Sequence, residues 1–579
     1  MFESLIYIFK LYVGFAIISY FALRLRFWDE CVGGDCVFKS LFYFLLFLFP
    51  ILFFAVKFKT LDAFFVVSVL FLILGVDFLS AKRKSGVRIN FVKTFLNQKI
   101  YDFLDGIAGF RFKFSSLKLK FEYVLLVIVF SFGLFFWINP SLQTLSLFSI
   151  IQHNNLVKIT SMLVNNFSSG INNVGMNSIC AFLSLIFGVN QHIVLHLFGA
   201  LNYGLIFVGI SLLTYRLTKN LHSVILASSL FAFVFLRFNF VLNHVEGSSF
   251  LLGLGWLLMV IYFWKDLRLF QKILALFVAF LIEFFAGSVL AFSVVVAELF
   301  ESGFKNKKKL HFLFAILISL LPFAIEIFSR GNPEFGIKAF AFFQSPELIG
   351  HSEEILNVVV FLTFLSVVLM LSSQIFYGIF SLILLIFTIA SEISVLNFVP
   401  YEQFFPISVL LFFIWFSVML RKVFGSKEKM HSIFVILIVV FLVLSVFIYG
   451  GVKIDGAIEP DEFVKVVLKI QKENLPFSFA IVSHYGTRAM VENWSYFMDW
   501  DYFLRNYILI EDEKKIYELV YVFVPEKNAM GKIHQSFIPR IDNLTATLDS
   551  ACVNYRFANV EIYFDGDYVK VYKLTKLKK

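Results

Sequence analysis

The sequence is poor in charge and in cysteine. Only 16% of its 579 residues are Asp, Glu, Lys or Arg, and four are cysteines. Two of these, Cys31 and Cys36 in ECVGGDC, have acidic neighbours but no histidine nearby, so they lack the ligand set of a zinc site. A small disulfide between them would require an oxidising compartment. No stretch matches a P-loop, a dinucleotide-binding fingerprint or HExxH, so nothing in the sequence indicates ATP-driven transport.

Apolar residues dominate what is present. The chain is 59% hydrophobic with 81 Phe, and its mean hydropathy is +0.84. A soluble domain cannot bury that much apolar side chain, and runs of roughly 18 or more apolar residues are typical of membrane spans. MFESLIYIFK lacks a basic segment ahead of its apolar run, so we predict that this run is a span rather than a signal peptide.

We predict a polytopic α-helical protein of the plasma or cytoplasmic membrane with about 14 spans. The candidate spans are residues 5–23, 39–56, 61–80, 123–139, 192–215, 221–237, 247–264, 270–284, 287–301, 310–328, 355–373, 375–392, 402–420 and 432–449. Glu283 and Gly287 interrupt one long apolar run and predict a tight turn between two short spans.

Charge is distributed unevenly along the chain. Residues 451–579 hold 17 basic and 18 acidic side chains, whereas the rest of the chain holds 33 and 22. The basic excess therefore belongs to the membrane part, which favours the positive-inside rule over nucleic-acid binding as its cause. Five basic loops fall on one side if the spans are right: 81–93, 111–121, 265–272, 305–309 and 421–429. These loops should be cytoplasmic, which places 140–175, 238–246, 329–354, 393–401 and everything after 450 outside.

This topology divides the chain into four parts. Residues 1–80 hold three extra amino-terminal spans, 81–122 form a basic cytoplasmic connection, and 123–450 form the transmembrane core with outer loop 140–175. Residues 451–579 read as a soluble extracytoplasmic α+β domain. Within it we predict helices at 460–474 and 490–507, strands at 477–485, 518–526, 559–564 and 568–574, and a hairpin turn at FDGD.

The stretch AFLSLIFGVNQHIVLHLFGALNYGLIFVGISLLTYRLTKNLHSVILASSLFAF, residues 181–233, carries a resemblance. It resembles the early core of GT-C-fold membrane glycosyltransferases, such as protein O-mannosyltransferases and oligosaccharyltransferases. In that pattern LSLIFGV is a short helix on the outer surface that ends a long first outer loop. A span then ends in a basic pair, here Arg216 and Lys219, and another span returns at once. Residues 401–420 resemble the late span of such proteins.

The resemblance implies a GT-C-like core and transfer of sugar from a polyprenyl-phosphate carrier on the outer side of the membrane. It also implies a carboxylate on the first outer loop, acting as base or metal ligand, and cations that hold the lipid phosphate. The sequence departs from this pattern, because residues 150–170 contain no Asp or Glu. That loop offers His153, Asn154, Asn155 and Lys158 instead, and Asn can bind a sugar but cannot act as a base. Gln403 stands where the late span of the family often carries Arg.

Other residues are candidates to replace the missing acid. RFNFVLNHVEGSSF places Arg237, His244 and Glu246 together at the outer mouth between two spans. The structural alternative is that Glu246 caps the next helix and that Arg237 marks the membrane interface. Our catalytic candidates are Glu246, His153 and His244, our substrate-binding candidates are Asn154, Asn155, Lys158, Arg237, Arg330 and Glu283, and we name no metal ligand.

Three hypotheses about function remain open. The first is a GT-C-like transferase, the second a non-catalytic membrane scaffold or glycolipid-binding relative, and the third a lipid flippase or transporter. The missing loop acid favours the second, and the scarcity of polar residues deep within the spans counts against the third. We expect a polyprenyl-phosphate carrier or another membrane lipid as partner, and no nucleic acid. A protein or glycan is a candidate partner of the outer domain, no cofactor is certain, and a divalent cation is left open.

Overall fold

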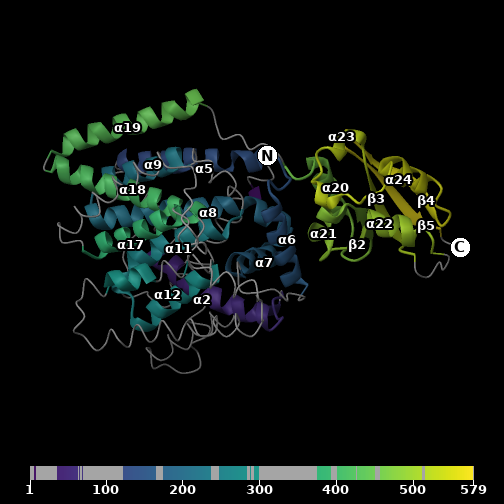
Figure 1. Cartoon of the computed structure of the whole chain (residues 1–579), viewed down its shortest axis with the longest axis horizontal. Coiled ribbons are helices and arrows are strands. Elements are labelled where there is room, and N and C mark those ends of the chain that lie inside the picture. The colour runs from purple at the N-terminus through teal and green to yellow at the C-terminus, as the bar shows by residue number, and fades with distance from the viewer. Residues whose placement is uncertain are drawn as a thin grey trace, which may run out of the picture.

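The computed structural model describes a helical body and a carboxyl-terminal sheet domain at one end of it (Figure 1). The described residues are 6–7, 35–62, 64–65, 68, 121–164, 174–235, 247–282, 287, 292–298, 375–392, 401–425, 427–449, 457–510 and 516–577.

Helices, most of them apolar, build the described part of the body. Their bounds are α2 (Asp35–Lys57), α5 (Phe121–Gln143), α6 (Ile150–Leu163), α7 (Val174–Phe187), α8 (Gln191–Thr218), α9 (Leu221–Val234), α11 (Ser249–Phe263), α12 (Leu269–Ile282), α17 (Ile375–Glu392), α18 (Tyr401–Phe424) and α19 (Glu428–Tyr449). Five described helices are long and apolar enough to cross a membrane: Phe121–Gln143, Gln191–Thr218, Ser249–Asp266, Pro406–Phe424 and Glu428–Ser445. The chain is therefore an integral membrane protein.

The predicted spans agree with the helices where the two can be compared. Nine of them coincide with α2, α5, α8, α9, α11, α12, α17, α18 and α19. The total of about 14 is not settled, because 5–23, 61–80, 310–328 and 355–373 lie wholly or mostly outside the described residues and 287–301 is described only at 287 and 292–298. The turn predicted at Glu283 and Gly287 is described only at Gly287, where an added Cβ would meet Ala279 O at 2.5 Å. Gly287 therefore lies close to the backbone near the end of α12.

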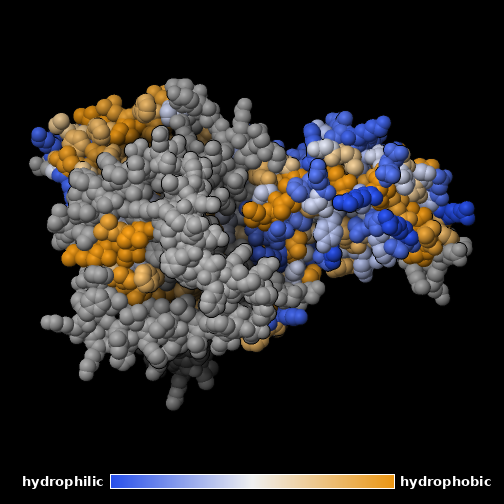
Figure 2. All heavy atoms as spheres, in the orientation of Figure 1, coloured by the Kyte–Doolittle hydropathy of each residue, from blue (hydrophilic) through white to orange (hydrophobic). Residues whose placement is uncertain are grey.

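Helix α8 lies at the centre of the body. It packs against α5, α7, α9, α11 and α18, and most of its residues are buried. Two glycines let α8 and α11 approach closely, because a Cβ on Gly209 would meet Leu258 Cβ at 2.6 Å and one on Gly255 would meet Leu205 Cβ at 2.9 Å. By contrast α19 exposes Ile433, Leu437 and Phe441, and Figure 2 shows that the visible surface of this helix is mostly hydrophobic. We expect lipid to cover that face.

The carboxyl-terminal domain is built on a five-stranded mixed sheet. Its strands are β1 (Ala480–Ser483), β2 (Tyr496–Asp499), β3 (Leu519–Pro525), β4 (Ala558–Asp565) and β5 (Val569–Lys576), in the order β2-β1-β3-β5-β4. Strand β1 is parallel to both β2 and β3, whereas β5 is antiparallel to β3 and β4. Helix α20 (Asp461–Glu473) has one buried face, and α24 (Leu544–Val553) packs on β3.

Most of the elements predicted for this domain are confirmed. The helix at 460–474 is α20, and the strands at 477–485, 518–526, 559–564 and 568–574 are β1, β3, β4 and β5. The FDGD turn joins β4 to β5, and Gly566 N donates to Val569 O at 3.1 Å.

The helix predicted at 490–507 is wrong. That stretch contains the end of α21 (Arg488–Val491), strand β2, α22 (Trp500–Tyr502) and a five-residue π-helix, Phe503–Tyr507. Tyr496, Phe497 and Met498 pair with the edge of β1, and tertiary pairing of this kind overrides local helical spacing. Asp499 then begins a new helical turn by accepting a hydrogen bond from Tyr502 N at 2.6 Å.

Candidate functional site

The carboxyl-terminal domain docks on the segment predicted as the first outer loop. Part of that segment is helix α6, and α6 contacts α7 and α8 on the body and α21 on the domain. Figure 1 shows α6 at the end of the body that carries the domain. We call the contact region formed by residues 144–160, the start of α8 and the domain the outer joint. The outer joint brings together segments that lie about 300 residues apart in the sequence.

Asp461 binds the loop that follows α5 to the carboxyl-terminal domain. Its carboxylate accepts hydrogen bonds from Leu145 N and Ser146 N, each at 3.0 Å, and a short one from the Thr144 hydroxyl. Next to it, Ile458 N donates to Leu147 O at 2.9 Å. One acid at the first position of α20 thus satisfies three donors of the loop that follows α5.

A buried pair of a histidine and a carboxylate side chain lies behind this contact. His484 Nε2 is 2.8 Å from Glu459 Oε2, and the two side chains are 0% and 4% exposed. The His484 ring stacks on Phe537 and packs edge-on against Phe463 and Trp500. Aromatic rings therefore keep water away from the pair, which makes loss of either partner costly.

His153 belongs to the same buried region. Its Nε2 donates to Gly486 O at 3.0 Å, its ring lies 4.7 Å from the ring of Phe537, and it is 5% exposed. Burial lowers the pKa of His153 below 6.5, although the Gly486 carbonyl and the charge of Glu459 raise it. The ring is therefore neutral at pH 7, and its hydrogen bond holds α6 to the domain.

Side-chain amides complete the joint at the start of α8. Asn190 Nδ2 donates to Gln471 Oε1 at 2.8 Å. Gln191 and Asn493 bond each other reciprocally, at 2.8 and 3.2 Å, and Gln191 also reaches Ala489 O at 3.0 Å. The Thr160 hydroxyl lies 2.6 Å from the same carbonyl. These groups are largely withdrawn from water, so their geometry specifies how the domain sits on the helices.

Two histidines tie the end of α5 to α8. His192 Nε2 donates to Leu145 O at 2.7 Å, and His196 Nε2 lies 3.0 Å from Ser141 O and 2.9 Å from Thr144 O. The resemblance did not single out either residue. The two histidines are four residues apart, so they lie on one face of the helix. This spacing is the only signal that the sequence gives.

The structure places the His153 side chain in the joint, away from solvent. We predicted a candidate base in a polar outer loop, but α6 turns this side chain into the joint and buries it against Phe537. Asn155 is also buried, with its Nδ2 at 3.5 Å from Gln152 Oε1. Asn154 is exposed and Lys158 is half-buried, so these two remain the accessible polar candidates of α6.

The other predicted site residues lie outside the described residues: Arg237, His244, Glu246, Glu283 and Arg330. Described residues next in sequence to two of them, Glu246 and Glu283, make contacts in the structure. Gly247, which follows Glu246, donates from its N–H to Leu195 O at 3.0 Å, one turn into α8. Gly175 packs on the last turn of α12, where its Cβ would lie 2.9 Å from Ile282 Cα, next to Glu283.

Helix α7 contributes a buried amide that sequence reasoning missed. Both polar side-chain atoms of Asn177 lack a hydrogen-bond partner, and the residue is fully buried among the described helices. The LSLIFGV stretch, predicted as a short helix, forms the end of α7 up to Phe187, and α2, α6, α8 and α12 pack around this helix. Within the described ranges, no group of three His, Cys, Asp or Glu side chains is placed to hold a metal ion.

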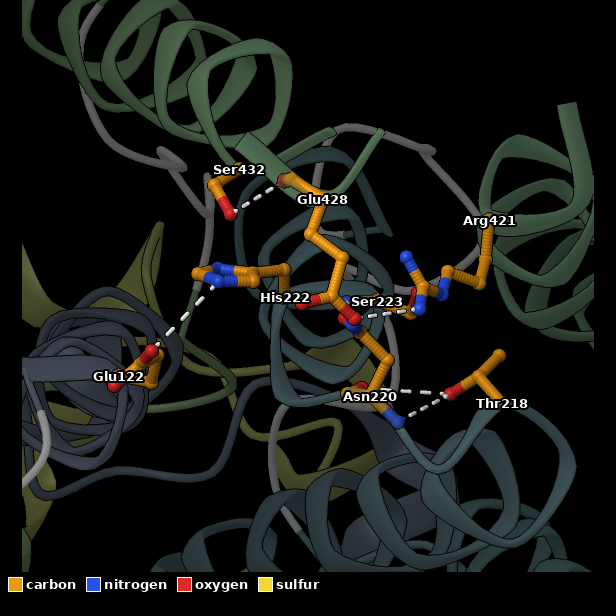
Figure 3. Close-up of polar contacts among 8 residues, drawn as sticks. All are labelled: Glu122, Thr218, Asn220, His222, Ser223, Arg421, Glu428 and Ser432. Atoms are coloured by element: carbon orange, nitrogen blue, oxygen red, sulfur yellow. Dashed lines mark hydrogen bonds and ion pairs between the residues drawn. The ribbon is translucent and has the colours of Figure 1, made fainter. Parts of the chain in front are cut away.

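A second polar cluster lies at the far ends of the helices (Figure 3). Arg421 pairs with Glu428 at 2.9 Å, and His222 Nε2 lies 3.7 Å from Glu122 Oε1. Asn220 caps α9 by accepting from Ser223 N at 3.2 Å. We call this group the loop-end cluster. It connects α5, α9, α18 and α19 beside the basic 421–429 loop, on the side predicted to be cytoplasmic.

Comparison with known proteins finds similarity only among solved structures. No family model and no curated protein matches the chain. The archaeal oligosaccharyltransferase AglB from Archaeoglobus fulgidus, solved with an inhibitory peptide and a dolichol-phosphate, is 12% identical, with a TM-score of 0.38 over 70% of each chain. The arabinofuranosyltransferase AftD from Mycobacteria is 12% identical, with a TM-score of 0.40 over 78% of this chain and 40% of that one.

Both solved structures are membrane glycosyltransferases of the GT-C fold, the family that the sequence resembles.

Proposed function

We propose that this chain is a GT-C-like membrane glycosyltransferase that moves a sugar from a polyprenyl-phosphate-linked donor to an acceptor on the side of the membrane that carries the carboxyl-terminal domain. The observation that carries the proposal is the outer joint. It holds the carboxyl-terminal domain against α6 and the start of α8, and Gly247 N donates to Leu195 O, one turn into α8. Acceptor, donor lipid and candidate residues would meet at this end of the body.

In this proposal Glu246 is the base. Its carboxylate would take the proton of an acceptor hydroxyl while the acceptor oxygen attacks the anomeric carbon and the polyprenyl phosphate leaves. Arg237 and Arg330 would bind the lipid phosphate, since a guanidinium can hold it through two parallel hydrogen bonds. His244 and Glu283 would line the sugar site, and Asn154 and Lys158 would contact substrate from the exposed face of α6.

One observation keeps the non-catalytic alternative open. The two acids at the centre of the joint, Glu459 and Asp461, are engaged in structural contacts, and residues 144–163 contribute no acid. A domain held in this way could also present a bound glycolipid without transferring its sugar. This alternative predicts lipid binding that survives loss of Glu246.

The deciding experiment measures binding and transfer separately. The full chain in nanodiscs is supplied with a polyprenyl-phosphate sugar, retained lipid is identified by mass spectrometry, and transfer to water or to an acceptor hydroxyl is followed. We expect Glu246→Gln to lower the transfer rate by about 10²–10⁴-fold with lipid retention unchanged. Glu428→Gln, the same change in the loop-end cluster, is the matched control and should leave transfer unaffected. Retention without transfer by the unaltered chain would favour the glycolipid-binding alternative, and neither retention nor transfer would overturn the substrate proposal.

A further inference from the structure

Three exposed apolar side chains gather at one corner of the carboxyl-terminal domain. Leu475, Phe477 and Tyr496 are 77%, 51% and 45% exposed. The Phe477 and Tyr496 rings meet edge-on with their centroids 5.9 Å apart, and Ser478 N closes a turn onto Leu475 O at 3.2 Å. We call these three residues the corner patch. Side chains of this kind, grouped and exposed, mark a surface that contacts something else.

The corner patch lies close to the first residue of a membrane span. Phe477 N donates to Trp494 O at 2.7 Å, and the preceding residue, Asn493, bonds Gln191. Gln191 is the first residue of α8, which is long and apolar enough to cross the membrane. The polar layers that flank the hydrocarbon core are each about 5–7 Å thick. Through Asn493 and Trp494 the patch is linked to the start of α8, the end of the span that would meet such a layer.

The backbone of Phe477 is strained in a way that an ordinary surface turn would avoid. Its φ is +58°, in the left-handed region that bulky residues rarely adopt. Gly or Asn would adopt this conformation at lower cost. The hydrogen bond to Trp494 O holds the strained residue in place with its ring facing outward. Strain retained at an exposed aromatic side chain points to a contact made by that side chain.

We propose that the corner patch inserts into the lipid headgroup layer of the leaflet on which the domain sits. Leu475 and the Phe477 ring would enter the boundary between headgroups and acyl chains. Tyr496 would present its ring to that boundary and its hydroxyl to the headgroups, as aromatic side chains of membrane interfaces do. Lys472, exposed one turn before Leu475, would supply a cation for lipid phosphate.

This contact is continuous with the outer joint and supports it from the side. The joint holds the domain to α6 and α8, while the patch would hold the adjoining edge to the membrane surface. The domain would then keep a fixed height above the lipid, whatever chemistry it serves.

Photo-crosslinking of the full chain tests the proposal. Benzoylphenylalanine replaces Phe477 in one variant, Tyr496 in a second and Ile562 in a third, each in nanodiscs of phosphatidylcholine and phosphatidylglycerol. Ile562 is the matched control, because it is 56% exposed on β4, at the opposite edge of the sheet from β2. After illumination, intact-mass spectrometry counts phospholipid adducts.

We expect phospholipid adducts at positions 477 and 496 and only background at 562. The Tyr496 variant keeps the test valid if the strained Phe477 position does not accept the larger side chain. Adducts with a peptide of a second copy would assign the patch to self-association and overturn the membrane contact. Adduct levels equal to those at Ile562 would overturn it as well.

Discussion

The two ends of the helical body are held together by different kinds of polar contact. At the outer joint the Glu459–His484 pair is almost fully buried. At the loop-end cluster Glu428 is 69% exposed and pairs with a partly buried Arg421. Water competes for the second pair but not for the first. Polar groups at the outer joint should therefore determine whether the domain is docked, whereas those at the loop-end cluster should adjust stability only slightly.

The largest effect should follow from breaking the buried pair. Glu459→Ala leaves the His484 ring buried beside aromatic rings without its carboxylate partner, which should cost about 3–5 kcal/mol of stability in the carboxyl-terminal domain, to which both residues belong. Thermal unfolding of the full chain in nanodiscs measures the loss, and hydrogen exchange shows where it occurs. Glu492→Ala is the control, because Glu492 is 41% exposed in an ion pair with Arg488. Equal destabilisation by the two substitutions would contradict the role assigned to the pair.

Removing the Asp461 carboxylate should come next. Asp461→Ala leaves Leu145 N and Ser146 N without their acceptor, and we expect a loss of about 2–3 kcal/mol. Amide hydrogen exchange in the peptide containing these two residues should accelerate. Asp501→Ala removes a partly exposed acid paired with Arg505 and should leave that peptide protected. Unchanged exchange after Asp461→Ala would mean that the loop holds its conformation without the domain.

The fold could be predicted from the sequence wherever one physical signal dominated. Apolar runs and basic loops gave spans that coincide with nine helices, because hydrocarbon allows few alternatives to a helix. The strand that includes Tyr496 could not be predicted in this way. Its aromatic residues fit a helix as well as a strand, and pairing with β1 decides between them.

Much less of the site could be predicted. A lone His153 in a polar stretch gives no sign that its ring will meet Gly486, more than 300 residues away. The acidic start of α20 indicated a helix terminus, but nothing local indicates that Asp461 caps a distant loop rather than its own helix. Such contacts depend on which surfaces meet, and a single sequence does not encode that in any local pattern.

Acid should loosen the outer joint through His153. Its pKa lies below 6.5 in the joint because of burial, while an undocked, solvated ring takes up a proton near 6.5. The open state therefore binds more protons, so joint stability is complete above about pH 6.5 and falls as the pH drops below it. Melting temperatures measured from pH 8 to pH 5 test this.

His153→Gln isolates the effect of that ring. Gln can still donate to Gly486 O but does not titrate, so the fall below pH 6.5 should become shallower. Glu459, His484 and His534 also surround the site and are unchanged in the variant. An identical pH profile in both proteins would assign the acid sensitivity to those neighbours.

The smallest effect should come from the loop-end cluster. Glu428→Gln removes the partner of Arg421 but keeps a side chain that can accept a hydrogen bond from the guanidinium. Because Glu428 is largely exposed, we expect a change of at most about 1 kcal/mol, smaller still at high salt. Melting curves at low and high ionic strength measure it beside Glu459→Ala. A loss at Glu428 as large as that at Glu459, and insensitive to salt, would show that water is excluded from both ends of the body. The contrast between the two ends would then fail, and burial of the partner helices would have to account for both clusters.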